Sequence, residues 1–260
     1  MESPSPSSTV VRVALVTGAP RRIGRHIALA LARAGWDVAV HYNRSRDEAE
    51  AVVGEIEALG RRAAAVHCDL SDEASVRALI GIAGLALGRV SCVVNNASLF
   101  DFDDTGSFGN ERLLRHMATN VGAPVLLAQA LFEATPEGEQ AVAVNLLDQK
   151  LYNPNPDYLS YTLSKAALHS ATTLLAQALA PRVRVVGVAP GLTMMSGEQT
   201  ADQFSKAHQV TPLGKSSTPE DVAAAVCYLA SAPAITGTTL LVDGGQHLLP
   251  LSRDVMFVAK

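Results

Sequence analysis

Short apolar runs alternate with amphipathic stretches along the 260 residues of the chain. The first apolar run, Val11 to Val16, is rich in β-branched residues and ends in Thr17-Gly18. Apolar positions from Ile23 to Leu31 then recur at helical spacing. This pattern predicts a strand, a tight turn and a helix.

The same unit repeats toward the C-terminus. Further strands are predicted at Asp37 to Tyr42, Ala63 to Cys68, Val90 to Val94, Gln140 to Leu147, Arg184 to Val188 and Thr239 to Val242. Helices are predicted from a capping box of Ser45 and Glu48 to Gly60, from Ser71 onward, and around 111–133, 158–180 and 219–231. Continuous apolar strands joined by helices favour a parallel sheet covered on both faces, a doubly wound Rossmann-type α/β fold. Ligands of such folds lie at the carboxyl ends of the strands.

A single domain over 11–260 is predicted, because no break in composition marks a second one. The opening segment 1–10 is rich in Ser and Pro and is expected to be a disordered tail. The long mixed segment 191–215 is predicted to be a flap over the substrate.

Composition excludes several classes of function. Hydrophobic residues make up 48% and charged residues 18% of the chain, and no apolar run approaches the roughly 18 residues needed to span a bilayer. The opening residues lack the features of a signal peptide, so a cytoplasmic location without a membrane partner is expected. The three cysteines are widely separated and favour neither a disulfide framework nor a metal site, and are interpreted as buried packing residues. A net charge of -4 argues against nucleic acid as a partner.

The turn from Thr17 to Gly24 carries the first candidate chemistry. Glycines after the first strand let the backbone approach a pyrophosphate held by the N-terminus of the next helix. Arg22 stands where a dinucleotide fingerprint has its middle glycine, and its guanidinium can reach the pyrophosphate and the substrate. The alternative is an ordinary glycine turn.

The end of the second predicted strand indicates which dinucleotide binds. An NAD site places a carboxylate about 20 residues after the glycine turn, whereas an NADP site places a cation there. Arg44 lies 20 positions after Gly24, and the segment His41 to Ser45 contains no acid. NADPH is therefore the predicted cofactor, the alternative being a solvated arginine beside a helix cap.

Tyr161 and Lys165 are four residues apart on a predicted helix, so their side chains share one face. A nearby ammonium is expected to lower the pKa of the phenol and make it a usable proton donor near neutral pH. The spacing alone also arises by chance.

The order of these motifs resembles the short-chain dehydrogenase/reductase family along nearly the full chain. The matching positions are the turn Thr17 to Gly24, Asp69, Asn95-Asn96-Ala97, Asn120, Tyr161 with Lys165, Pro190-Gly191 and Asp243-Gly244-Gly245. The resemblance implies that Asp69 and the Asn-Asn-Ala turn hold adenosine and backbone. It also implies that Asn120, Tyr161 and Lys165 form a proton relay.

One departure from the family pattern points to a branch. Asp148 lies 13 positions before Tyr161, where the family usually has a serine that donates to a substrate carbonyl. Unless it is protonated, a carboxylate repels developing negative charge and suits instead a nitrogen heterocycle that carries NH donors. The chain here resembles pteridine reductases, through Arg22, His41 with Arg44 and Ser45, Ser98 with Phe100, and Asp148.

That resemblance implies a site in which a pterin or folate lies between Phe100 and the nicotinamide. The expected catalytic residues are Asp148, Tyr161, Lys165 and Asn120. The expected cofactor-binding residues are Gly18, Arg22, Ile23, Gly24, Tyr42, Asn43, Arg44, Ser45, Asp69, Leu70, Asn95, Asn96, Ala97, Ser98, Tyr161, Lys165, Pro190 and Gly191. The expected substrate-binding residues are Arg22, Ser98, Phe100, Asp148 and Tyr161.

Several alternatives stay open at this point. Phe100 is also explained as a packed core ring, and Asp148 as a structural ion pair or helix cap. The chain is alternatively a carbonyl reductase of the same family, or a non-catalytic dinucleotide-binding redox sensor. The family resemblance implies a homotetramer, and the tail 254–260 is either an interface strand or a packed terminus.

Overall fold

Seven parallel strands form one sheet in the described part of the chain, in the order β3-β2-β1-β4-β5-β6-β7. The structure is a computed structural model that describes residues 11–195, 200–209 and 211–258. The predicted tail 1–10 lies outside these residues. The strands are β1 (Val13–Val16), β2 (Asp37–Tyr42), β3 (Ala63–His67), β4 (Val90–Asn95), β5 (Ala141–Leu146), β6 (Val183–Pro190) and β7 (Thr239–Val242).

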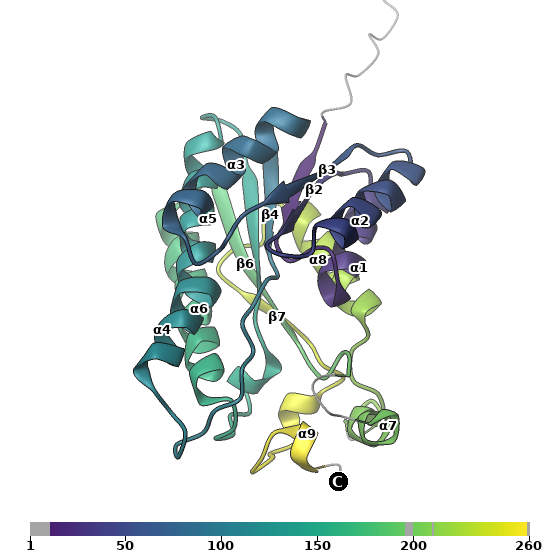
Figure 1. Ribbon diagram of the computed structural model, residues 1–260, viewed down its shortest axis with the longest axis vertical. Coiled ribbons are helices and arrows are strands. Elements are labelled where there is room, and N and C mark those ends of the chain that lie inside the picture. Colours follow the sequence, from purple (N-terminus) through teal and green to yellow (C-terminus); the bar gives the residue numbers. More distant parts are fainter. Residues whose placement is uncertain (1–10, 196–199, 210, 259–260) are drawn as a thin grey trace, which may run out of the picture.

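Helices cover both faces of this sheet, as Figure 1 shows. They are α1 (Arg22–Arg33), α2 (Arg46–Ala58), α3 (Glu73–Leu87), α4 (Asn110–Met117), α5 (Ala123–Ala134), α6 (Leu159–Ala178), α7 (Ala201–Gln209), α8 (Pro219–Ser231) and α9 (Val255–Val258). One layer contains α1, α2 and α8, and the other contains α3, α5 and α6. The predicted doubly wound Rossmann-type fold is confirmed.

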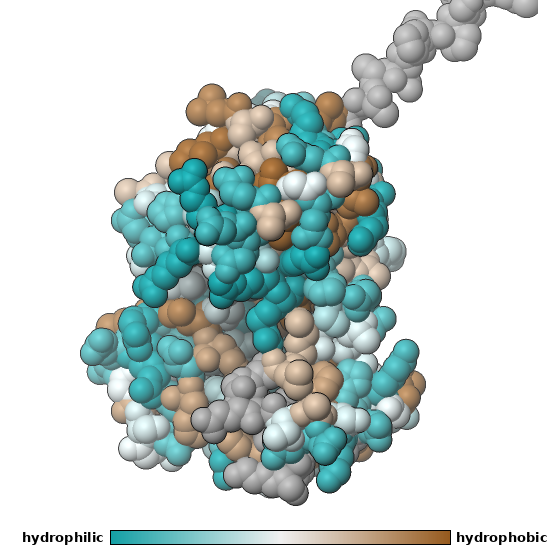
Figure 2. All heavy atoms as spheres, turned by 45° about the vertical axis from the view of Figure 1, so that its right-hand side comes forward, coloured by the Kyte–Doolittle hydropathy of each residue, from teal (hydrophilic) through white to brown (hydrophobic). Residues whose placement is uncertain are grey.

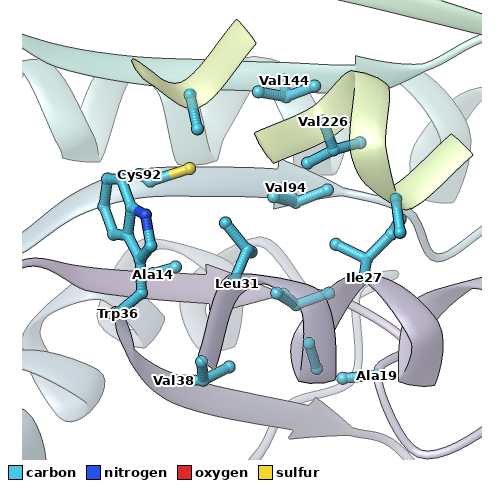
Figure 3. Packing of buried hydrophobic residues seen from close by; sticks show 14 of the residues in the cluster. Ala14, Ala19, Ile27, Leu31, Trp36, Val38, Cys92, Val94, Val144 and Val226 are labelled. Atoms are coloured by element: carbon cyan, nitrogen blue, oxygen red, sulfur yellow. The ribbon is translucent and has the colours of Figure 1, made fainter. Parts of the chain in front are cut away.

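Alternate residues of each central strand enter opposite halves of the core. Ala14 and Val16 of β1 belong to the cluster under α1 and α8, whereas Val13 and Leu15 belong to the cluster on the other face. Figure 3 shows Leu31 of α1 in the first cluster. Each buried Val or Leu side chain stabilises the fold by about 1.5 to 3 kcal/mol, so the sheet is a rigid support for the loops at its carboxyl edge.

Two local predictions from the sequence are wrong. Ser45 stands at the start of α2 but makes no capping hydrogen bond with its side chain. Glu48, the supposed partner in the capping box, instead forms an ion pair with Arg21 of the glycine turn. The helix that was expected to start at Ser71 begins at Glu73, because Asp72 is its N-cap and accepts from Ser75 N at 3.0 Å.

Three longer segments differ in detail from their expected form. The helix predicted over 111–133 is divided into α4 and α5 by a π-helical stretch, Ala118–Gly122. The predicted flap 191–215 contains α7, and its residues 196–199 and 210 lie outside the described ones. Of the tail 254–260, the described part forms the short helix α9 rather than a strand. Cys68 and Cys92 are buried as expected, whereas Cys227 is partly exposed.

No helix in the described ranges is long and apolar enough to cross a membrane.

Candidate active site

The glycine turn after β1 has a backbone that larger residues cannot adopt. Gly18 has a φ of +62°, in the left-handed region that favours glycine. A Cβ on Gly24 would lie 2.3 Å from Gly18 O, so the first turn of α1 packs directly on the turn. This close approach leaves space at the N-terminus of α1, where a pyrophosphate is expected to bind.

His41 at the end of β2 holds this turn in place. Gly18 N donates to His41 Nδ1 at 3.0 Å, and the other ring nitrogen, Nε2, lies 3.1 Å from Cys68 O. Burial lowers the pKa of His41 to about 4, so the ring is neutral and carries its proton on Nε2. The sequence identified His41 only as part of a resemblance, whereas the structure shows that it joins the ends of β1, β2 and β3.

Thr17 joins the glycine turn to the Asn-Asn-Ala turn after β4. Its Oγ1 accepts from Asn96 N and Ala97 N, each at 3.0 Å. Asn96 Nδ2 donates back to Thr17 O at 2.9 Å. Thr17 is absent from the expected site residues, although its place between a buried strand and a glycine is the signal that could have found it.

Asn95, in contrast, is buried and serves the sheet. Its Nδ2 donates to Asn145 Oδ1 on β5 at 2.8 Å. Its side chain therefore does not face the surface where the cofactor is expected.

Polar side chains that could recognise the adenosine end lie exposed beside β2 and β3. Asn43 and Arg44 are exposed after β2, and Asp69 is exposed after β3. Asp69 accepts hydrogen bonds from Ser71 N and Ser71 Oγ, at 2.9 and 2.7 Å, and these bonds keep the pKa of its carboxyl low, with a smaller contribution from the charge of Arg44. Tyr42 is half-buried and Leu70 is buried beside this surface.

Asp148 and Tyr161 form the centre of the site. Tyr161 donates its hydroxyl hydrogen to Asp148 Oδ2 at 2.8 Å. The other carboxylate oxygen, Asp148 Oδ1, accepts from Lys150 N at 2.8 Å and caps a short 3-10 helix, Gln149–Leu151. Asp148 is thus both a cap and the partner of the tyrosine, and burial raises the pKa of its carboxyl.

The expected lowering of the tyrosine pKa by Lys165 is wrong for this structure. Burial, followed by the charge of Asp148, holds the pKa of Tyr161 well above its ordinary value. Lys165 is 3% exposed and donates to Leu146 O at 2.7 Å, while its Nζ lies 5.7 Å from the centre of the tyrosine ring. Burial also lowers the pKa of Lys165 to about 8. The phenol therefore keeps its proton and hydrogen-bonds to a carboxylate.

Asn120, expected in a proton relay, joins the loop after β4 to α6 by side-chain hydrogen bonds. It lies in the π-helical stretch between α4 and α5 and is 1% exposed. Its side chain accepts from Leu99 N at 2.8 Å and donates to Leu99 O at 3.1 Å. It also donates to Ser164 Oγ at 2.9 Å, and Ser164 in turn donates to Tyr161 O at 2.7 Å. These bonds fix the loop that carries Phe100 against α6.

Phe100 lies beside Tyr161 and is 41% exposed, which excludes a purely structural core ring. Its ring edge contacts Tyr161, with ring centres 4.7 Å apart and an angle of 85°. It also stacks on Tyr158, at 4.3 Å and 12°. Tyr158 was not among the expected site residues. Ser98, two residues earlier, is exposed and donates to Leu99 O at 3.1 Å.

The segment after β6 passes over the glycine turn. Arg22 Nη1 donates to Met195 O at 2.9 Å, which joins the start of α1 to the predicted flap. Directly after β6, a Cβ on Gly191 would lie 2.5 Å from Ser216 Oγ. Figure 2 shows hydrophobic residues at the narrowing between the upper and lower parts of this face.

A family model described as enoyl-(acyl carrier protein) reductase matches residues 18–247. The chain belongs to the short-chain dehydrogenase/reductase family. It is 32% identical over 253 residues to the 3-oxoacyl-[acyl-carrier-protein] reductase FabG of Staphylococcus aureus, a match that covers 92% of this chain and 99% of that protein.

Two similar solved structures are FolM alternative dihydrofolate reductase 1 from Brucella canis and from Brucella suis, both in complex with NADP. The first is 40% identical with a TM-score of 0.85 and covers 92% of this chain and 95% of that chain. The second is 39% identical with a TM-score of 0.85 and covers 94% of this chain and 98% of that chain. The family and the fold expected from the sequence are confirmed.

Proposed function

We propose that this chain is an NADPH-dependent reductase of a flat, pterin-like heterocycle, taking a dihydropterin or dihydrofolate to its tetrahydro form. The observation that carries the proposal is the hydrogen bond of 2.8 Å from Tyr161 to Asp148, beside the exposed ring of Phe100. A phenol and a carboxylate together offer both a donor and an acceptor to ring nitrogens. The likeness to the two FolM structures supports this substrate class.

The residues present fit NADPH. The turn at Gly18 and Gly24 has no room for side chains, as a close approach to pyrophosphate requires. Exposed Arg44 supplies a cation for the 2′-phosphate, with Ser45 and Asn43 beside it. Asp69 and Ala97 would border the adenosine end, and Lys165 the nicotinamide end. When bound, NADPH supplies the hydride that reduces the ring carbon.

The proton in this reaction is held by the chain itself. Tyr161 keeps it on Oη, because burial and Asp148 raise the pKa of the phenol. Asp148, whose pKa burial raises, accepts from Tyr161 and is placed to return a proton to it from solvent. Lys165 holds positive charge beside the pair below a pH of about 8 and stabilises a tyrosinate as it forms. Asn120 fixes the loop of Phe100.

A carbonyl reductase of the same family is the second candidate, and the likeness to FabG favours it. Asp148 argues against it, because a carboxylate beside the substrate oxygen repels the negative charge that develops there. A non-catalytic redox sensor is the third candidate. The close arrangement of Tyr161, Asp148 and Lys165 argues for catalysis instead.

We also propose that the segment 191–215 acts as a flap over the substrate, and the hydrogen bond from Arg22 to Met195 O supports this proposal. A homotetramer and a cytoplasmic location are further predictions from the sequence, and the proposed chemistry at the site does not depend on them.

An NADPH oxidation assay tests the proposal. Dihydrobiopterin, dihydromonapterin, dihydrofolate and a panel of ketones are offered to the purified protein, and the loss of NADPH is followed together with the identity of the product. Formation of a tetrahydropterin or tetrahydrofolate is the expected result. Efficient reduction of ketones without reduction of any pterin would establish the second candidate, and no turnover of any compound would favour the third.

A further inference from the structure

The segment after residue 247 lies outside the part of the chain that the family model matches. It nevertheless returns to the carboxyl end of the sheet, where α9 and α7 lie together below the strands in Figure 1. Its described part runs to residue 258 and contains Arg253, Asp254 and Phe257. These residues contact the two loops that carry the candidate catalytic groups.

Buried charges anchor this segment. Arg253 pairs with Asp157 at 2.8 Å, and Asp254 N donates to the same carboxylate at 2.7 Å. Lys150 Nζ lies 3.4 Å from Asp254 Oδ2. Asp157 and Lys150 are both buried, so each requires these partners to offset the loss of water. Lys150 follows Asp148 by two residues, and Asp157 precedes Tyr158, so the anchors act on both sides of the site.

The aromatic rings continue the connection. Tyr158 stacks on Phe100 at 4.3 Å and on Phe257 at 6.3 Å, and the rings are inclined by 12° and 20°. Phe102 meets Tyr158 and Phe257 edge-on, at 5.2 and 5.7 Å. Tyr158 is 7% exposed and has a φ of +54°, so its ring is enclosed at a strained backbone position. Tyr158 thus lies between Phe257 and Phe100 and contacts both rings.

We propose that Arg253, Asp254 and Phe257 form a wall of the substrate site and that Phe257 is a positioning residue for flat substrates, acting through Tyr158 on Phe100. This inference rests on the proposed function for the class of substrate, a planar heteroaromatic ring. It assigns substrate discrimination to a segment that the family model does not include. Phe257 pairs with the rings of Phe102 and Tyr158 and forms no ring pair with Tyr161.

The test is Phe257→Ala, with Phe257→Tyr as the conservative variant. Loss of the ring removes the aromatic contacts with Tyr158 and Phe102, so KM for the substrate is expected to rise about three- to tenfold. Turnover at saturation and the dissociation constant of NADPH are expected to stay within about twofold, because Phe257 forms no ring pair with Tyr161 and is not among the residues expected to bind the cofactor. Phe257→Tyr is expected to restore KM.

Phe108→Ala is the matched control. Phe108 is 41% exposed and forms no ring pair with any described aromatic residue, so the same truncation there is expected to leave KM unchanged. Arg253→Gln removes the anchor without opening the core and is expected to raise KM by a smaller factor. Combined with Phe257→Ala, it should add little further, because both changes release the same contact.

The KM is measured with the substrate class that the unmodified enzyme reduces, so the two proposals fail separately. Reduction of ketones alone refutes the pterin proposal, while the KM of the ketone still decides the role of Phe257. An unchanged KM in Phe257→Ala, or an equal rise in Phe108→Ala, overturns the positioning role. A loss of NADPH binding or of folding in Phe257→Ala that Arg253→Gln reproduces also overturns it, because the segment would then support the fold and not the site. Absence of any turnover in the unmodified protein contradicts both proposals.

Discussion

The cofactor half and the substrate half of the site are built by different means. At the glycine turn, main-chain groups and short side chains make the contacts, as between Gly18, His41 and Thr17. Around Tyr161, side chains make the contacts: Tyr161 donates to Asp148, and the neighbouring Tyr158 stacks on Phe257 from the last described segment. The first half is set by backbone geometry, whereas the second can change its substrate through single side chains without a change of fold.

The largest effect is expected from a substitution that changes the substrate half alone. Asp148→Asn keeps the shape of the side chain and removes its titratable proton, so pterin turnover should fall by about a hundredfold to ten-thousandfold. NADPH affinity, measured by fluorescence titration, should not change. Asp148→Ser is the matched variant, because it restores the neutral hydroxyl typical of the family and should gain weak carbonyl reduction. Full pterin turnover in Asp148→Asn would remove the carboxylate from the mechanism.

Tyr161→Phe also separates the two halves. It deletes only the hydroxyl that donates to Asp148 and should reduce turnover by on the order of a hundredfold or more while NADPH still binds. Single-turnover kinetics and cofactor titration measure the two properties. Normal turnover is incompatible with the proton path, and loss of NADPH binding would make this residue structural.

A change in the cofactor half should weaken cofactor binding and leave turnover at saturating cofactor nearly unchanged. Arg44→Asp removes a charge-assisted contact with the 2′-phosphate, worth about 1.5 to 3 kcal/mol, and should weaken NADPH binding about ten- to a hundredfold. The preference should then shift to NADH, while turnover at saturating cofactor changes little. Equal use of NADH and NADPH by the unmodified protein would show that residues 41–45 do not read the phosphate.

The smallest effect is a pH dependence located in the substrate half. Burial lowers the pKa of Lys165 to about 8, so its ammonium is present below that pH and is lost above it. If the charge assists proton transfer, kcat/KM should fall about tenfold for each pH unit above 8. Lys165→Arg, which stays charged, should shift this limb upward even if its activity is lower. A flat profile in the unmodified enzyme between pH 7 and 9.5 contradicts the role of the ammonium.

The sequence predicts the cofactor half better because its signals are local. The bounds of β2 and β7 agree with the apolar runs that predict them. Arg44 lies two residues after the end of β2, so its position is predicted together with that strand. The capping box at Ser45 fails because Glu48 finds a partner, Arg21, that lies in another turn. A pattern within one segment contains no information on such competition.

The substrate half exceeds what local patterns can show. Asp148 and Tyr161 are found from their spacing, but the raised pKa of the phenol depends on burial, which only the packed fold determines. Tyr158 and Phe257 carry no motif, and they stack beside the ion pair of Asp157 with Arg253, whose members are 96 residues apart in the chain. Resemblance to a family gives no guidance there, because the family model ends at residue 247.

The most direct test of the account is the ratio of kcat/KM for dihydrobiopterin to kcat/KM for a simple ketone, measured with saturating NADPH on the unmodified enzyme and on Asp148→Ser. The account predicts a ratio well above one that falls by about a hundredfold or more in the variant, because the carboxylate favours a nitrogen heterocycle over a developing oxyanion. A ratio below one in the unmodified enzyme, or one that the substitution leaves unchanged, would contradict the assignment of Asp148 and Tyr161 as a pterin-reducing pair.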